Sequence, residues 1–239
     1  MKNSIFFISL IFSFLARSQS LRVGEWRDHL SYTYAHDVCE VGNSMYVSTE
    51  LALFEYNTLD NSIERLNTLN RLSDMGVSSI GTSGSLLIVA YENGNIDLIR
   101  GDAKVNLPDI KRASLIADKR INHINIDNNL AYLSCGFGIV VLDIDREEVK
   151  DTFFIGEYGA QENVLSTCIA HNSIYAATDK GLYKAEVYKS NLADYHSWEK
   201  LPAHSQSYID MLESFSGLLF VNLHGEEYNT DTLYHFDGT

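Results

Sequence analysis

The feature that most constrains the fold is an internal repeat with a period of 42 to 45 residues. Five segments share one order of residue types: an apolar or aromatic pair, small residues, a turn and a second apolar run. The second residues of these segments follow one another at separations of 42, 44, 43 and 45, in the series Tyr46, Ile88, Tyr132, Tyr175 and Phe220. An apolar landmark precedes each segment, in the series Val38, Ile80, Ile124, Ile169 and Met211. This near-constant phase predicts five copies of one structural unit.

Four short strands are expected within each period, and the third copy shows them most clearly. Its first strand alternates, which places Ile121 and His123 on one face and Ile124 on the other. Asn, Asp and Gly residues form the turns, and the expected strands are Ile121–Asp127, Leu130–Ser134, Ile139–Ile144 and Val149–Ile155. Period-two alternation between such turns is typical of antiparallel strands. Four strands per period predict an all-β fold, a β-propeller of four-stranded antiparallel blades, whereas solenoid repeats are usually shorter or helical.

The period also predicts how the chain is divided into blades. About five blades are expected, at residues 35–70, 76–111, 120–157, 163–203 and 207–239. A closed ring of six to eight blades at this period needs about 250 to 350 residues, so residues 19–239 are expected to form an incomplete propeller, truncated from a probable seven blades. The segment around Trp26 resembles the outer strand around Trp198. We therefore expect residues 22–28 to be the closing outer strand of the last blade.

The first 18 residues have the pattern of a secretory signal peptide. Lys2 precedes an apolar run from Ile5 to Ala16, and small residues at Ala16 and Ser18 suit cleavage after Ser18. The run is too short for a membrane span, which needs about 20 apolar residues. The sequence thus predicts an exported protein.

Composition excludes several classes of protein. The 45% hydrophobic content is too high for a disordered chain, and three cysteines are too few for a disulfide scaffold. The formal net charge is -14, and removal of Lys2 and Arg17 with the signal peptide leaves -16. Nucleic-acid binding calls for a dense basic face, so a nucleic-acid partner is not expected.

One basic cluster stands against this negative balance. Lys111, Arg112, Lys119 and Arg120 lie in the long connection between the second and third blades. In a propeller, such a connection shares a face with the turns between second and third strands. These four residues are the candidate ligand-binding site, because they could hold phosphate or carboxylate groups of an anionic glycan. The alternative is a solvated loop. Tyr32, Tyr34 and Tyr91 offer a sugar-stacking platform, or are simply outward-facing blade residues.

No local signature of catalysis, metal binding or cofactor binding is present. The sequence lacks a nucleophile elbow, a phosphate-binding loop, a His-Glu-x-x-His motif and a Cys-x-x-Cys motif. Its eight histidines never occur at i and i+2 or i+4, and the group Asp143, Asp145 and Glu147 lacks the glycine and further donors of a calcium loop. The cysteines are expected to be buried, with at least one unpaired. We expect no enzyme activity, no metal and no cofactor.

Blade-specific phrases carry a family resemblance. The run Leu72–Ile80 and the step Thr178–Tyr183 resemble the repeats of two-component-regulator propellers. The phrases Trp26–Leu30, Ala90–Leu98, Ala131–Asp145 and Asn191–Tyr195 resemble the N-terminal propeller of the PorZ family, a component of the type IX secretion system of Bacteroidetes. The resemblance covers roughly residues 22–239.

The resemblance implies a non-catalytic part at the outer membrane and cell surface. It implies partners in the outer-membrane secretion and sortase complex, and a role in presenting anionic lipopolysaccharide to the sortase. The family chain continues with a second propeller and a sorting domain. The rival interpretation is a periplasmic ligand-sensing propeller of a hybrid two-component regulator, which would be followed by a membrane span and a kinase. The third is a propeller enzyme such as a glycan lyase, for which no convergent set of residues stands out.

Overall fold

The protein is described by a computed structural model that covers residues 29–188, 191–202, 208–225, 227 and 229–236. The predicted signal peptide at 1–18 and the predicted closing strand at 22–28 lie outside the described residues. Among the residues described, no helix is long and apolar enough to cross a membrane.

Within the described residues, five antiparallel sheets follow one another along the chain. The first contains β1 to β4, at Ala35–Val41, Ser44–Thr49, Leu53–Asn57 and Ile63–Leu66. The second contains β5 to β8, at Val77–Ser83, Leu86–Tyr91, Ile96–Arg100 and Ala103–Leu107. The third contains β9 to β12, at Ile121–Asp127, Leu130–Cys135, Gly138–Asp143 and Glu148–Phe153. The fourth contains β13 to β16, at Val164–Ala170, Ser173–Thr178, Gly181–Glu186 and Glu199–Lys200. The fifth contains β17 to β19, at Ile209–Phe215, Leu218–Leu223 and Thr232–Phe236.

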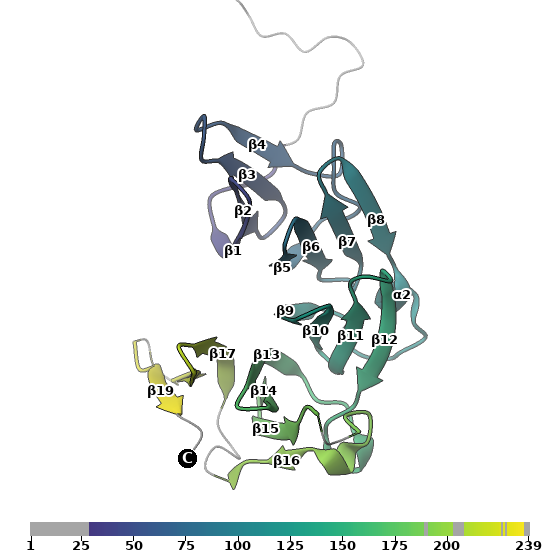
Figure 1. The fold of residues 1–239 in the computed structure, drawn as a ribbon, viewed down its shortest axis with the longest axis vertical. Helices are drawn as coiled ribbons and strands as arrows, with labels where there is room; N and C mark the ends of the chain where they lie inside the picture. Colours follow the sequence, from purple (N-terminus) through teal and green to yellow (C-terminus); the bar gives the residue numbers. More distant parts are fainter. Residues whose placement is uncertain (1–28, 189–190, 203–207, 226, 228, 237–239) are drawn as a thin grey trace, which may run out of the picture.

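The sheets are the blades of a β-propeller. Neighbouring strands pair in chain order within each sheet, and the sheets are arranged along an arc with β1, β5, β9, β13 and β17 toward its inside (Figure 1). The outer strands β8 and β12 lie on the outer edge of the arc (Figure 1). Short helical turns occur in the connections, at Asp109–Arg112 (α2), Glu157–Gly159 (η1) and Tyr195–Ser197 (η2). The predicted all-β propeller fold with four-stranded antiparallel blades is therefore confirmed.

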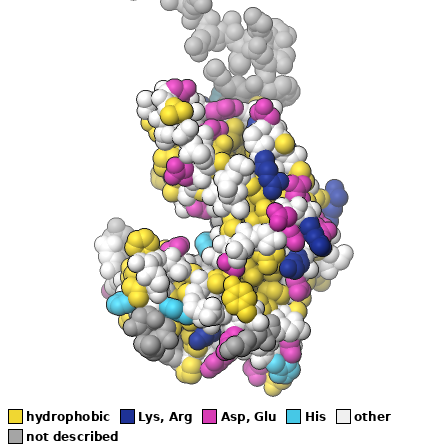
Figure 2. Space-filling model, in the orientation of Figure 1, with side chains coloured by type: hydrophobic (Ala, Val, Ile, Leu, Met, Phe, Trp, Pro, Cys, Tyr) yellow, Lys and Arg dark blue, Asp and Glu magenta, His cyan; other side chains and the backbone are white. Residues whose placement is uncertain are grey.

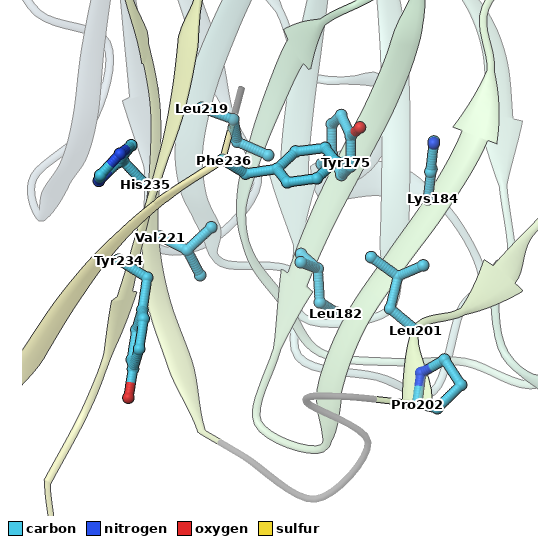
Figure 3. A pocket seen from close by; sticks show the side chains of 10 residues that line it. All are labelled: Tyr175, Leu182, Lys184, Leu201, Pro202, Leu219, Val221, Tyr234, His235 and Phe236. Carbon is cyan, nitrogen blue, oxygen red and sulfur yellow. The ribbon is translucent and has the colours of Figure 1, made fainter. Parts of the chain in front are cut away.

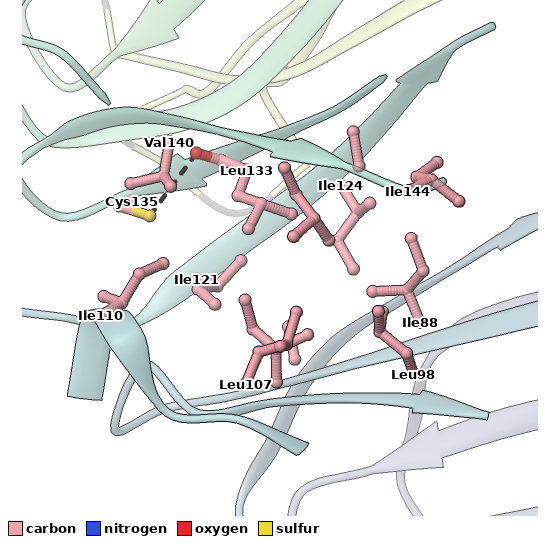
Figure 4. Packing of buried hydrophobic residues seen from close by; sticks show 14 of the residues in the cluster. Ile88, Leu98, Leu107, Ile110, Ile121, Ile124, Leu133, Cys135, Val140 and Ile144 are labelled. Atoms are coloured by element: carbon pink, nitrogen blue, oxygen red, sulfur yellow. Dashed lines mark hydrogen bonds between the residues drawn. The ribbon is translucent and has the colours of Figure 1, made fainter. Parts of the chain in front are cut away.

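The hydrophobic core is divided among the four junctions between successive blades. The largest cluster joins blades two and three, where Ile88 and Leu98 meet Ile121 and Leu133 (Figure 4). Comparable clusters lie between blades one and two, three and four, and four and five. The second strands β6 and β14 are buried along their whole length, since each of their two faces packs against a neighbouring blade. Continuous apolar and small residues in these strands follow from that double burial.

A β-bulge recurs in the first strand of every blade. The register shifts leave one residue without a partner in each, in the series His36, Ser78, Asn122, Leu165 and Asp210. These positions are separated by 42, 44, 43 and 45 residues, the same intervals as the sequence repeat. An extra residue reverses the alternation beyond it. Ile121 consequently joins Ile124 in one core cluster, and the predicted placement of these two residues on opposite faces was wrong.

In blades one, three and four, the side chain of the residue after the bulge connects its blade to the next one. Asp37 Oδ2 accepts from the backbone N–H of Ile80 at 2.9 Å, and Ser166 Oγ accepts from that of Leu212 at 3.1 Å. His123 Nδ1 takes the same place toward the N–H of Thr167 at 3.5 Å. A first strand has an unpaired edge, so these side chains satisfy amides that no strand pairs with. Side chains of the inner strands therefore connect neighbouring blades.

Candidate functional site

The four predicted site cations lie together at the edge of blades two and three. Lys111 and Arg112 end the α2 turn after β8, and Lys119 and Arg120 precede β9. The backbone N–H of Gly136, in the turn between β10 and β11, donates to the carbonyl of Arg120 at 3.2 Å. The connection thus shares a face with the turns between second and third strands, as expected. A Cβ at Gly136 would lie 2.6 Å from the carbonyl oxygen of Asp118, so only glycine permits this close approach.

Two of the four cations form ion pairs with acids from other connections. Lys111 Nζ lies 2.6 Å from Asp74 Oδ2, and Arg120 Nη1 lies 2.8 Å from Glu92 Oε1. Burial acts to raise the pKa of Asp74, but hydrogen bonds from Lys111 and two asparagines, with the Lys111 charge, outweigh it and lower that pKa. The basic cluster is therefore accompanied by acids that its place in the sequence does not reveal.

The other two cations are placed differently. Lys119 Nζ donates to the carbonyls of Lys111 at 2.9 Å and Ala113 at 2.7 Å, which folds the connection back on itself. The Arg112 side chain is exposed, and its guanidinium makes no hydrogen bond or ion pair within the described part of the chain. Lys and Arg side chains alternate with Asp and Glu on this side of the molecule (Figure 2). Arg112 is thus the cation of the four that is most available to a ligand.

A mostly apolar groove of about 340 Å³ adjoins the same connection. Ile110 and Leu115 line it from the connection, and Phe137 and Phe154 line it from blade three. The two phenylalanine rings lie 6.3 Å apart. One short segment, residues 108–120, therefore carries the cations and also lines the groove.

The tyrosine platform suggested by the sequence does not form. Tyr91 is fully buried, and its hydroxyl donates to Asp97 Oδ2 at 2.6 Å. Arg65 lies over the ring of Tyr32 at 4.9 Å from its centroid, whereas Tyr34 is exposed. Tyr91 is a core residue, and it is unavailable to a sugar.

An apolar pocket of about 370 Å³ lies between blades four and five (Figure 3). Leu182 and Leu201 line it from blade four, and Val221 and Phe236 from blade five, with the Phe236 ring pointing toward Tyr175 (Figure 3). It contains few polar groups that could orient a ligand, and it continues the core cluster of these two blades.

The histidines and cysteines lie in separate places. All three cysteines are free, and burial raises the pKa of the Cys39 and Cys168 thiols to about 12. One histidine lies among carboxylates in blade five: His224 Nδ1 is 3.6 Å from Asp210 Oδ2 and 3.4 Å from Asp231 Oδ1. The ligand atoms of these three residues fall within 4.8 Å of one another, a cluster that the sequence did not predict.

The structure also contains a pocket of aromatic side chains that sequence reasoning missed. It occupies about 500 Å³ where the connection from blade three meets the connection between β15 and β16. Tyr183 and Trp198 lie in it, with Tyr195 and His196 beside them. The sequence signal was present in the phrase Asn191–Tyr195, but strand periodicity says nothing about the approach of two loops.

The structure is a β-propeller in which the inner strands connect neighbouring blades. The candidate sites lie in the connections, which carry exposed polar and aromatic side chains. Comparisons with known proteins identify the family within this class of β-propellers. The sequence matches the family described as "TSS9, PorZ, N-terminal beta-propeller domain" over residues 45–199, which is more than half of the chain. The chain belongs to this family of type IX secretion system propellers. No curated protein sequence matches it.

Solved structures show the same fold at low sequence identity. PorZ of Porphyromonas gingivalis, described as an essential surface component of the type IX secretion system, is 21% identical with a TM-score of 0.67. The extracellular domain of BT3049 from B. thetaiotaomicron, assigned to a hybrid two-component system, is 13% identical with a TM-score of 0.62. The matches cover 83% and 86% of this chain, but only 28% and 30% of those chains. The Cps50 (Swd1) propeller of Myceliophteria thermophila is 13% identical with a TM-score of 0.58, covering 84% of this chain and 70% of that one.

Proposed function

We propose that this propeller is an exported, non-catalytic binding module of the type IX secretion machinery at the cell surface. Its ligand is anionic lipopolysaccharide, which it holds for the sortase partner of the outer-membrane complex. Membership of the PorZ family supports the place in secretion. The observation that carries the choice of ligand is the arrangement of four cations along residues 108–120.

The neighbouring acids do not block such a ligand. The Lys111 and Asp74 side chains are 41% and 22% exposed, and those of Arg120 and Glu92 are 45% and 51% exposed. Exposed ion pairs contribute only about 0–1 kcal/mol. A phosphate accepts bidentate, charge-assisted hydrogen bonds from a guanidinium, which are roughly twice as strong as neutral ones. Exchange of a surface carboxylate for a phosphate is therefore favourable at Arg120, and Arg112 has no pair to exchange within the described chain.

The adjoining groove suits the same ligand class. Lipopolysaccharide carries its phosphates next to acyl chains. The groove lined by Ile110 and Phe154 is mostly apolar, and the charged residues Lys111 and Arg112 follow Ile110 directly in the chain. An anionic amphiphile would contact both surfaces at once. A free anionic glycan would use the cations alone.

The test is binding of the full-length protein carrying this propeller to purified anionic lipopolysaccharide, measured by biolayer interferometry at several salt concentrations. Arg112→Glu, and then reversal of all four cations, should weaken binding by about ten-fold or more and flatten its salt dependence. Lys150→Glu on the outer strand β12 makes the same charge change at an exposed site and should have little effect. Unchanged affinity in the four-site variant would refute the proposal. Binding of lipid-free glycan with equal affinity would assign the site to the saccharide phosphates.

A further inference from the structure

The aromatic pocket beside the fourth blade has a rigid floor. The Trp198 ring packs 6.4 Å from that of Phe153, and its Nε1 donates to the carbonyl of Leu192 at 2.9 Å. Tyr183 is 7% exposed, and Lys200 Nζ lies 5.7 Å from the centroid of its ring. Phe153 of blade three and the Leu192 carbonyl hold the Trp198 ring, and Tyr183 lies in β15, so a ligand would meet a surface already formed.

The Tyr195 and His196 rings form the outer wall of the pocket, and the Tyr158 ring lies next to Tyr195, outside the lining of the pocket. The Tyr195 and His196 rings lie 3.9 Å apart, and those of Tyr158 and Tyr195 lie 6.3 Å apart. His196 Nδ1 is 2.8 Å from Asp194 Oδ1, which fixes the orientation of the imidazole. The Tyr158 side chain is 81% exposed, and the Tyr195 ring beside it does not bury it.

The loop that presents Tyr158 is strained. Tyr158 has φ of 58°, a left-handed conformation that bulky residues rarely adopt, and Gly159 after it has φ of 72°. The turn is closed by hydrogen bonds from Gly156 N to the Ala160 carbonyl and from Gly159 N to the Gly156 carbonyl. A left-handed aromatic residue costs of order 1–3 kcal/mol, and such strain clusters at ligand sites. Here it turns a large ring toward solvent beside the pocket.

Acidic and basic side chains are mixed around the pocket. Glu157 and Glu162 lie on its rim together with Lys200, and Lys180 Nζ pairs with Glu162 Oε2 at 2.8 Å. The edge of the pocket therefore offers both hydrogen-bond donors and hydrogen-bond acceptors. Aromatic faces with polar groups at their edges match a pyranose, whose apolar C–H faces stack on rings while its hydroxyls turn to the rim.

We propose that this pocket is a binding site for an uncharged saccharide ring, separate from the cationic connection at residues 108–120. It rests on the proposed function in that both sites take parts of one surface glycan. The cationic connection holds the charged groups, and the aromatic pocket holds a neutral sugar of the same polymer. Tyr195 and Tyr158 stack on the sugar, and Glu157 and Lys200 contact its hydroxyls.

The test uses a panel of uncharged tri- to hexasaccharides, from glucans, mannans, galactans and chitin, with the full-length protein, measured by isothermal calorimetry and saturation-transfer NMR. At least one should bind, and Tyr195→Ala and Tyr158→Ala should each weaken that binding about ten-fold. Tyr188→Ala is the matched control, since Tyr188 is 69% exposed in the same connection and outside the pocket. Unchanged melting temperatures exclude loss of the fold.

The outcomes separate this inference from the proposed function. Failure of the whole panel, or equal binding by Tyr195→Ala and the wild type, overturns the inference even where Arg112→Glu weakens lipopolysaccharide binding. Binding of a lysine-rich peptide in place of any sugar also overturns it, because it would make the pocket a site for cations. Neutral-sugar binding that survives reversal of the four cations supports two separate sites.

Discussion

A buried carboxylate in blade two allows a quantitative test of the packing. Asp97 on β7 is fully buried and has no cation among its hydrogen-bond partners in the described chain. Its Oδ2 accepts from the Tyr91 hydroxyl at 2.6 Å and the Ser73 N–H at 2.7 Å, and its Oδ1 accepts from Asn106 Nδ2 at 2.9 Å. Burial, followed by the Asp97 charge, raises the pKa of Tyr91, so the phenol keeps its proton and donates.

Tyr91→Phe removes one of these three donors and leaves the ring in place. Hydrogen bonds to charged groups contribute about 1.5–3 kcal/mol, and the free energy of unfolding should fall by that amount. Tyr175→Phe is the matched control: its ring is also buried, but its hydroxyl has no partner among the described residues. Because a buried unpaired hydroxyl costs about 1–3 kcal/mol, Tyr175→Phe should be neutral or stabilising.

The assay is equilibrium unfolding of the full-length protein in urea, followed by circular dichroism, with the slope m compared between variants. The two substitutions delete the same atom from the same residue type, so side-chain volume cannot explain a difference between them. A wild-type midpoint for Tyr91→Phe would refute the reasoning. An equal loss in both variants would refute it too.

Three further predictions concern pH, thiol reactivity and sterics. Burial, partly offset by the Asp37 charge, lowers the pKa of His123 from 6.5, so the unfolded chain binds this proton first as the pH drops. The free energy of unfolding should therefore fall between pH 7 and pH 5. In His123→Gln, the urea midpoint should depend less on pH over the same range. Burial raises the pKa of the thiols, so iodoacetamide at pH 8 should label Cys135 and Cys168 only after unfolding and the half-buried Cys39 only slowly before it. Labelling of Cys135 or Cys168 in the native protein, detected by mass spectrometry, would contradict their buried placement. Gly136→Ala should cost about 1–3 kcal/mol because its Cβ meets the Asp118 carbonyl, and a wild-type melting curve would contradict that contact.

Strand positions could be predicted from the sequence because they depend on local patterns. The predicted strand Ile121–Asp127 coincides with β9, and Leu130–Ser134 differs from β10 by one residue. The bulge could not be predicted, since it depends on pairing with the next strand. The landmarks Ile169 and Met211 show the consequence: the residues two positions after the bulge in those blades are Thr167 and Leu212, so these two landmarks are displaced from the structural repeat by two residues and by one.

The site was predictable in its cations but not in their surroundings. Lys111 and Asp74 are 37 residues apart in sequence, and Arg120 and Glu92 are 28 apart, so each ion pair depends on how one connection lies on another. The same limit applies to the aromatic pocket, where two loops from different blades approach. Tyr91 shows the converse error, because an abundant residue type was read as exposed when its hydroxyl is needed by Asp97.

The recurrent bulge explains why ligand sites are expected in the connections and not on the inner strands. In three blades the residue after the bulge, Asp37, His123 or Ser166, forms a hydrogen bond with the next blade. A substitution there that suited a ligand would remove an inter-blade hydrogen bond. In the connections only buried residues such as Ile110 and Ile155 pack between blades, and the exposed residues do not. Residues 108–120 and 154–163 differ in length, charge and aromatic content while the bulges keep their spacing. Substitutions of exposed residues in the connections should therefore alter ligand binding more than the stability of the fold.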